Sequence, residues 1–219
     1  MAFTGLREAG LTKARIEALT DGIFATVMTV LVLGLRPPTT DLSSPGASLS
    51  NELSKLAPNI LTYALSFITL GIYWIGHHNQ FHYIRRTDRA LLWINIVFLM
   101  SVGFTPFTTS LLGTYPGDPA AVRAYGANLV ANGLGLYGIW WYATSGRRLV
   151  DSDLAPSTVR LAKTRILVGP AFFATGIAVS FISPLASIII FFLPIPYYIL
   201  PGHIDVHIRG EHQHEERSP

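Results

Sequence analysis

The 219-residue chain is 50% hydrophobic and only 13% charged, with a mean hydropathy of +0.40. This composition excludes an ordinary soluble domain and indicates an integral membrane protein. The net charge of +3 does not indicate nucleic-acid binding, because the basic residues lie beside apolar stretches instead of in one patch with aromatic side chains. The absence of cysteine excludes a disulfide framework and a thiolate metal site.

Six apolar stretches approach the ~20 residues that a helix needs to cross a hydrocarbon core of ~30 Å. No short apolar segment with a cleavage site precedes them, so we expect the first span to remain in the mature protein. The last two are short and tightly joined around Ser183-Pro184. The stretches cover approximately residues 17–36, 58–78, 90–112, 121–143, 164–182 and 184–200.

The basic residues between these stretches predict the orientation. Thirteen of the 16 Lys and Arg side chains fall on the side that holds both termini, whereas Arg36, Lys55 and Arg123 fall on the other. Cytoplasmic segments carry this excess of basic residues. We therefore predict an all-α integral membrane protein with six transmembrane helices and both termini in the cytoplasm, in one domain over residues 1–200, and a His-rich cytoplasmic tail over 201–219.

The first span begins with charged residues. Glu17 and Asp21 are four residues apart and share a helix face, and Arg15 precedes them. About thirteen residues follow Asp21 before the span ends, too few at 1.5 Å each to cross ~30 Å. The span must therefore take in the acidic turns, whose charges are expected to face protein or water. Taken alone, the pattern also fits interfacial flanking residues and a helix cap.

A second polar set ends the second span and comprises Trp74, His77, His78 and His82. His78 and His82 have the spacing of metal ligands on a helix, but no third ligand is evident nearby. We therefore predict no metal site and expect hydrogen bonds to Asp21 or Arg15 instead. Asn95 on the third span is expected to join helices in the same way.

These motifs resemble those of the transmembrane protein 175 family of potassium channels. The stretch RIEALTDG is similar to the signature R-x-x-x-F-S-D-G, with Arg15, Asp21 and Gly22 in place, while Leu19 replaces the Phe and Thr20 the Ser. The second and third spans add two further likenesses, Trp74-x-x-His77-His78-x-x-Phe81 and Asn95 followed by Thr105-Pro106-Phe107. The resemblance covers about residues 13–112 and is thin afterwards.

The resemblance implies a potassium-selective channel, not an enzyme, with no cofactor besides the permeant ion. In that family four six-span units surround a central pore that the first spans line, so a single unit implies a homotetramer in the lipid bilayer. The likeness is to the prokaryotic branch of the family, which implies a location in the bacterial inner membrane. The signature residues then act as a hydrogen-bonded support at the cytoplasmic end of the pore helix. The residues assigned to this support are Arg15, Thr20, Asp21, Trp74, His77, His78 and Asn95.

The residues also predict which face of the first span lines the pore. No TVGYG-like segment is present to supply a carbonyl filter, so selectivity must come from side chains and pore hydration. Helical steps of three and four place one stripe on a single face: Gly22, Thr26, Thr29 or Val30, and Leu33. Family members generally carry bulky aliphatic residues there, which form a hydrophobic constriction, whereas Thr26 offers a hydroxyl. The same stripe also fits ordinary packing between membrane helices.

Other functions remain open from the sequence. A proton-coupled or solute transporter would use Asp21 and the histidines of the second span as its relay. A membrane enzyme with His78 and His82 as ligands lacks a third ligand and a polar catalytic loop. An inactive assembly subunit would use the four glycines of the fourth span, which more simply permit close helix packing.

Overall fold

The computed structural model describes residues 12–38 and 48–200, and the His-rich segment 201–219 lies outside them. In this part of the chain every regular element is helical. The α-helices are α1 (Lys13–Leu31), α2 (Leu49–Lys55), α3 (Ala57–Tyr83), α4 (Arg89–Thr114), α5 (Pro119–Thr144), α6 (Pro156–Val179), α7 (Pro184–Phe192) and α8 (Pro194–Ile199). Two short 3₁₀ helices, η1 (Val32–Gly34) and η2 (Ser145–Arg147), follow α1 and α5.

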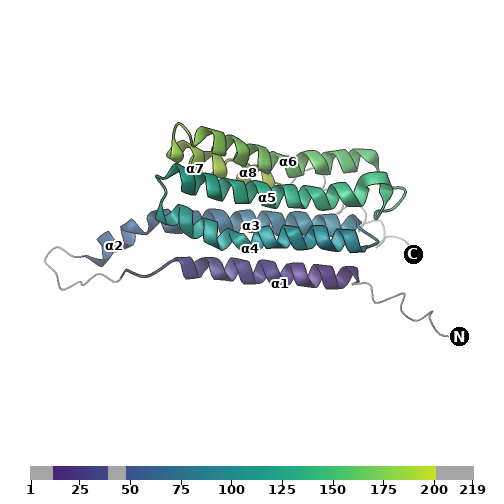
Figure 1. Ribbon diagram of the computed structural model, residues 1–219, viewed down its shortest axis with the longest axis horizontal. Helices are drawn as coiled ribbons and strands as arrows, with labels where there is room; N and C mark the ends of the chain where they lie inside the picture. The colour runs from purple at the N-terminus through teal and green to yellow at the C-terminus, as the bar shows by residue number, and fades with distance from the viewer. Residues whose placement is uncertain (1–11, 39–47, 201–219) are drawn as a thin grey trace, which may run out of the picture.

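The long helices form a bundle in which α1 is an edge element (Figure 1). α1 packs against α3 and α4, whereas α5 lies between α4 and α6. By length and composition, the segments that can cross a membrane are Lys13–Gly34, α3, α4 and α6. α5 matches them in length, with 26 residues, although glycines and asparagines interrupt its apolar sequence. The chain is therefore an all-helical membrane protein.

The predicted sixth span, 184–200, is two short helices instead of one. Pro194 has no N–H to continue the hydrogen-bond ladder of α7, so a new helix of six residues starts there. Tyr198 near its end accepts a hydrogen bond from the Gly169 N–H (2.9 Å) and donates one to the Arg165 carbonyl (2.8 Å). Sixteen residues of helix reach only about 24 Å, short of a hydrocarbon core.

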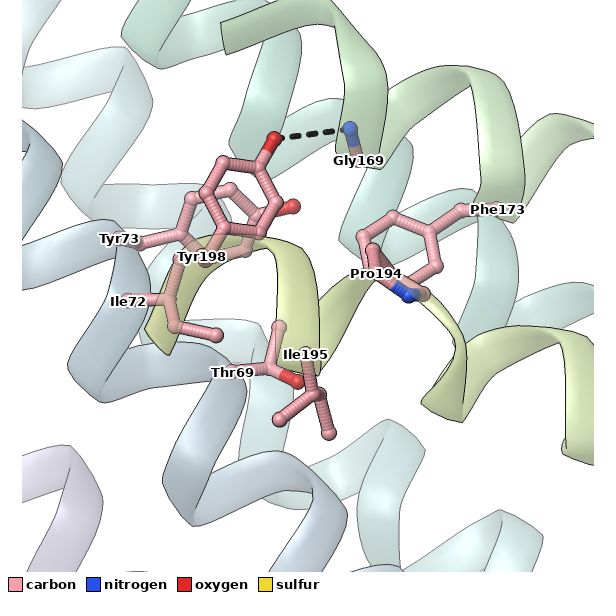
Figure 2. A pocket seen from close by; sticks show the side chains of 8 residues that line it. All are labelled: Thr69, Ile72, Tyr73, Gly169, Phe173, Pro194, Ile195 and Tyr198. Atoms are coloured by element: carbon pink, nitrogen blue, oxygen red, sulfur yellow. Dashed lines mark hydrogen bonds between the residues drawn. The ribbon is translucent and has the colours of Figure 1, made fainter. Parts of the chain in front are cut away.

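A small pocket lies where α8 meets α3 and α6. Figure 2 shows Tyr73 and Tyr198 together on one side of it and Phe173 with Pro194 on the other. Its volume is about 10 Å³, room for roughly one water molecule. The Thr69 hydroxyl lines this pocket and has no hydrogen-bond partner among the described residues. This is the position where a single buried water would satisfy it.

Glycines on α5 set how closely its neighbours approach. A Cβ at Gly135 would lie 2.9 Å from Cδ2 of Phe98 on α4, and a Cβ at Gly126 would lie 2.7 Å from Cγ1 of Ile177 on α6. Any larger residue would push these helices apart. Gly126 and Gly135 therefore permit close packing within one subunit, whereas a Cβ at Gly138 would have no neighbour nearer than 3.8 Å.

The end of the bundle that carries most basic residues is tied together by backbone contacts. The start of α1, the α3–α4 turn and the α5–α6 connection all lie at this end (Figure 1). The Leu149 carbonyl accepts from the backbone N–H groups of Arg85 (2.9 Å) and Arg86 (3.2 Å). An ion pair between Arg85 and Asp151 (3.0 Å) and a hydrogen bond from Tyr142 to Asp88 (2.7 Å) add to this tie. These contacts therefore join the α3–α4 turn to the end of α5 and to the α5–α6 connection.

Candidate functional site

One face of α1 is exposed and the other is buried against the bundle. The buried positions are Ile16, Thr20, Phe24, Val27 and Leu31. All five residues predicted for the pore face are exposed: Gly22, Thr26, Thr29, Val30 and Leu33. The exposed fraction of Leu33 is 73%, similar to that of Met100 on α4 (72%). In the single subunit this face is therefore open to lipid, to other copies of the chain or to an aqueous pore.

The exposed stripe is longer than the sequence analysis recognised. Arg15 and Leu19 are exposed as well and continue the same helical spacing toward the N-terminus, in steps of four and three. Leu19 was noted only as a departure from the family signature, and Arg15 only as a member of the support. Arg15 and Leu19 lie seven and three residues before Gly22, and this helical spacing predicts that they share its face.

The hydroxyl groups on the stripe donate to their own helix. Thr26 Oγ1 donates to the Gly22 carbonyl (2.8 Å), and Thr29 Oγ1 donates to the Ala25 or Thr26 carbonyl (3.0 and 2.8 Å). Since the proton of each hydroxyl is used by the backbone, the remaining oxygen lone pairs face outward as acceptors. Such oxygens can coordinate a cation or accept from its hydration water, but they offer no donor to an anion.

A buried polar chain holds the other face of α1. The side-chain amide of Asn95 on α4 donates to Thr20 Oγ1 (3.1 Å), and its Oδ1 lies 3.0 Å from Nε2 of His77 on α3. All three side chains are buried. The His77 ring also stacks against Phe81 and Phe98, with ring centroids 4.3 and 5.9 Å apart. This chain therefore links α1, α3 and α4 through hydrogen bonds and ring contacts.

A second polar contact lies at the surface of the bundle. Trp74 Nε1 donates to Asp21 Oδ1 at 2.8 Å, and the Trp74 ring stacks on His78 with centroids 6.0 Å apart. Trp74 and His78 are both exposed in the single subunit. The Arg15 side chain forms no hydrogen bond or ion pair with another of the described residues, so the expected contact from Arg15 to α3 or α4 is not part of this arrangement.

The structure also reveals a polar stripe that the sequence analysis missed. The buried face of α3 carries a polar side chain at almost every turn, in the series Thr62, Ser66, Thr69, Tyr73, His77 and Gln80. Ser66 bonds to Thr109 of α4 (2.7 Å) and to Tyr125 of α5 (3.0 Å). The signal for this polar stripe was the spacing of its members, which recur every three or four residues within an apolar helix. Only His77 was singled out, because the hydroxyl residues alone are common in membrane helices.

No group of three or more His, Asp or Glu side chains with metal-binding geometry occurs among residues 12–38 and 48–200. His78 and His82 are both exposed on α3. The pair therefore has no third ligand within the part of the chain that the structure describes.

This chain is similar to known channel proteins over most of its length. The family model for the endosomal/lysosomal potassium channel TMEM175 matches residues 15–106. A potassium channel of Streptomyces collinus is 32% identical over 173 residues, 77% of this chain and 82% of that protein. The crystal structure of a lysosomal potassium-selective channel TMEM175 homolog from Chamaesiphon minutus superposes with a TM-score of 0.76 at 30% identity, covering 86% of this chain and 96% of that chain.

A human relative shares the same segment within a longer protein. The human endosomal/lysosomal proton channel TMEM175 is 26% identical over 187 residues, which are 85% of this chain and 36% of the human protein. The bacterial relatives, by contrast, are covered over most of their length. The chain belongs to the TMEM175 family of membrane channels.

Proposed function

We propose that this chain is the subunit of a passive potassium channel, in which four copies surround a central pore lined by α1. The bacterial relatives are named as potassium channels, and the Chamaesiphon homolog as potassium-selective. The observation that carries the proposal is the exposure of the stripe from Gly22 to Leu33 on an edge helix, while the opposite face of the same helix is buried.

The pore would have two chemically different parts. Toward the basic end, rings of Thr26 and Thr29 present oxygen acceptors, because their protons are used by the helix backbone. Farther along, rings of Val30 and Leu33 form a hydrophobic constriction that excludes water. A cation passing this constriction must shed part of its hydration shell. Potassium holds that shell less tightly than sodium, so the constriction favours potassium.

The buried polar chain positions the pore helix. Thr20 bonds to Asn95, and Asp21 bonds to Trp74, so two consecutive residues of α1 are fixed to α4 and α3. His77 completes the chain from inside the bundle, and His78 stacks on Trp74 at its surface. We assign these residues to positioning of the pore helix and not to ion coordination. Arg15 would lie at the inner mouth of the pore if both termini are cytoplasmic.

Flux measurements on paired variants test the pore face. Thr26→Leu should reduce potassium current and raise the discrimination against sodium, because a ring of hydroxyls is replaced by apolar side chains. Leu33→Ser should increase leak of both ions. Val32→Ser is the matched control, because Val32 is exposed at 46% but points about 120° away from Leu33 around the 3₁₀ helix η1.

The measurement is ion flux into liposomes with equal amounts of reconstituted protein, under potassium and under sodium. If Val32→Ser changes permeation and Leu33→Ser does not, the pore face is rotated from the one proposed. If neither variant changes permeation, α1 does not line the pore. Mass measurement in mild detergent should give four chains per particle, and a stable monomer would contradict the central pore.

A proton-coupled function is the second candidate, because the human relative is named as a proton channel. A proton relay would need hydrogen bonds that carry a proton between Asp21 and the histidines of α3. Asp21 bonds instead to Trp74, and His77 is buried against Asn95, Phe81 and Phe98. Potassium flux should therefore proceed without a pH gradient. Flux that occurs only with such a gradient would favour the transporter.

A further inference from the structure

A proline lies inside α4 at a position that weakens the helix. Pro106 has no N–H, so the carbonyl of Val102 loses the donor that the fourth residue along a helix normally supplies. Gly103 lies in the same turn, and a Cβ built on it would have no neighbour within 4 Å. A turn with a missing hydrogen bond and a glycine resists bending less than the rest of the helix. The direction of α4 after Pro106 must therefore be fixed by contacts with other helices.

One amide of α5 contacts α4 on both sides of this proline. Asn128 Nδ2 donates to the Ser101 carbonyl (2.8 Å), and Asn128 Oδ1 accepts from Thr108 Oγ1 (3.1 Å). Ser101 precedes Pro106, whereas Thr108 follows it. The Ser101 carbonyl can only accept, so the amide nitrogen must face it and the amide oxygen is left to face Thr108. Thr108 Oγ1 also lies 3.1 Å from the Thr105 carbonyl, so its single proton serves either acceptor.

The next asparagine along α5 contacts only one side of the proline. Asn132 Nδ2 donates to Thr105 Oγ1 (3.2 Å), and Thr105 directly precedes Pro106. Asn132 is fully buried, and Asn128 is 6% exposed. The two residues therefore have the same side chain, the same helix and the same neighbour, but of the two Asn128 alone spans the break in α4.

The part of α4 after the proline lies against the end of the first span. A Cβ built on Gly34 of η1 would lie 3.9 Å from the Cβ of Ser110 on α4. Leu33, at the end of the exposed stripe, directly precedes Gly34. Ser110 lies four residues beyond Pro106, about 6 Å along the helix, so a change of about 10° in the bend would move it by about 1 Å. Such a shift would be passed to Gly34 and its neighbour.

The part of α4 before the proline holds the other end of α1. Thr20 accepts a hydrogen bond from Asn95 (3.1 Å), and the rings of Phe24 and Phe98 lie 6.0 Å apart. α4 thus contacts the two ends of the first span with two segments that meet at Pro106. The angle between these segments decides where the far end of the first span lies relative to its near end.

We propose that Asn128 is a positioning residue for ion permeation, which fixes the angle of α4 at Pro106 and, through Ser110 and Gly34, the place of Leu33 in the pore. The inference rests on the proposed function of α1 as the pore helix. Without the Asn128 bridge, α4 would adopt a range of angles and the ring of Leu33 would be wider on average. An ion would then keep more of its hydration water, so discrimination between potassium and sodium would fall.

Cross-linking tests the structural part of the proposal. The chain has no cysteine, and the separation between Gly34 and Ser110 suits a disulfide, whose two Cβ atoms lie about 3.5–4.5 Å apart. The Gly34→Cys/Ser110→Cys variant is oxidised in liposomes, and the thiols that remain are counted with a maleimide mass tag. Asn128→Leu should slow the cross-linking several-fold, whereas Asn132→Leu should leave its rate close to that of the parent. Equal rates in these two backgrounds would overturn the proposal.

Flux measured without the added cysteines tests the consequence for permeation. Asn128→Leu should lower the ratio of potassium to sodium flux several-fold, while Asn132→Leu should keep the native ratio even if it lowers stability as much. Leu33→Ser is measured beside them. If Leu33→Ser changes the ratio and Asn128→Leu does not, α1 lines the pore and the positioning role is wrong. If Leu33→Ser changes nothing, the pore assignment itself is wrong, whatever the cross-linking shows.

Two further variants keep the test decisive if Asn128→Leu fails to fold. Thr108→Val removes one side of the bridge with little change of shape, so it should lower the flux ratio in the same direction by a smaller factor. Pro106→Ala restores the missing N–H, so Thr108→Val should have little effect on the flux ratio in that background. A native flux ratio for Thr108→Val, or an equal effect with and without Pro106, would overturn the proposal.

Discussion

Two threonines on α1 allow the support of the pore helix to be separated from the pore itself. Thr20 is fully buried and accepts a hydrogen bond from Asn95 on α4, whereas Thr26 is exposed and donates only to its own backbone. Replacing either by valine removes one hydroxyl from the same helix with little change of shape. The two variants should therefore fail in different ways.

The loss of stability expected for Thr20→Val follows from its contact with Asn95. An interhelical hydrogen bond in a membrane protein contributes about 0.6 kcal/mol on average and at most about 1.7 kcal/mol. The variant also leaves a buried amide N–H of Asn95 without an acceptor, at a cost of about 1–3 kcal/mol. We expect the free energy of unfolding to fall by about 1–3 kcal/mol. Thr26→Val should stay within about 0.5 kcal/mol of the native chain, as is usual for surface changes.

Unfolding in mixed micelles with increasing denaturing detergent, followed by tryptophan fluorescence, measures both variants. Potassium flux measured on the same preparations should show the opposite order, with Thr26→Val reduced and Thr20→Val close to native once it is folded. A double-mutant comparison uses Asn95→Leu as the background. In this background Thr20→Val should lower the free energy of unfolding only slightly, because the hydrogen bond is already absent. If Thr20→Val is as stable as the native chain, the buried chain from Thr20 to His77 does not hold α1.

Three other predictions concern packing, the surface contact and metals. Gly135→Ala should destabilise the protein by about 1–3 kcal/mol, because its Cβ would lie 2.9 Å from Phe98 Cδ2, while Gly138→Ala, whose Cβ has no neighbour nearer than 3.8 Å, should be neutral or stabilising. Asp21→Asn and Trp74→Phe should be non-additive in a double-mutant cycle of stability, and additivity would show that their hydrogen bond contributes nothing. A chelator should leave assembly and flux unchanged, and loss of either would indicate a metal site.

Much of the fold could be predicted from hydropathy because the apolar runs that become α1, α3, α4 and α6 are long enough to leave few alternatives. The sixth element was predicted less well. Length and apolar character indicated one span over 184–200, but Pro194 ends α7 and the next helix is too short to cross the membrane. A proline near the middle of a minimal span was the local signal for this break.

The side of α1 that faces away from the bundle was predictable, because helical spacing alone decides which face a residue occupies. Thr26 and Leu33 share a helical face from sequence, and the exposed side of α1 contains both. Which partners meet across helices was not predictable, because it depends on how α1, α3 and α4 are placed side by side. Thr20 lies next to Asn95, and Trp74 next to Asp21, whereas the Arg15 side chain has no hydrogen-bond or ion-pair partner among the described residues.

The position of the two polar contacts on α1 has a mechanical consequence. Among the described residues, Thr20 and Asp21 alone join this helix to its neighbours by side-chain hydrogen bonds, and beyond them Phe24, Val27 and Leu31 are held by apolar packing. Apolar contacts are not directional, so small tilts cost little there. Leu33 lies about 20 Å along the axis from Thr20, and a tilt of about 5° around that point would move it by about 1.7 Å. In the proposed tetramer, α1 can therefore tilt about Thr20 and Asp21. Such a tilt would change the width of the pore at Leu33 without breaking either interhelical hydrogen bond.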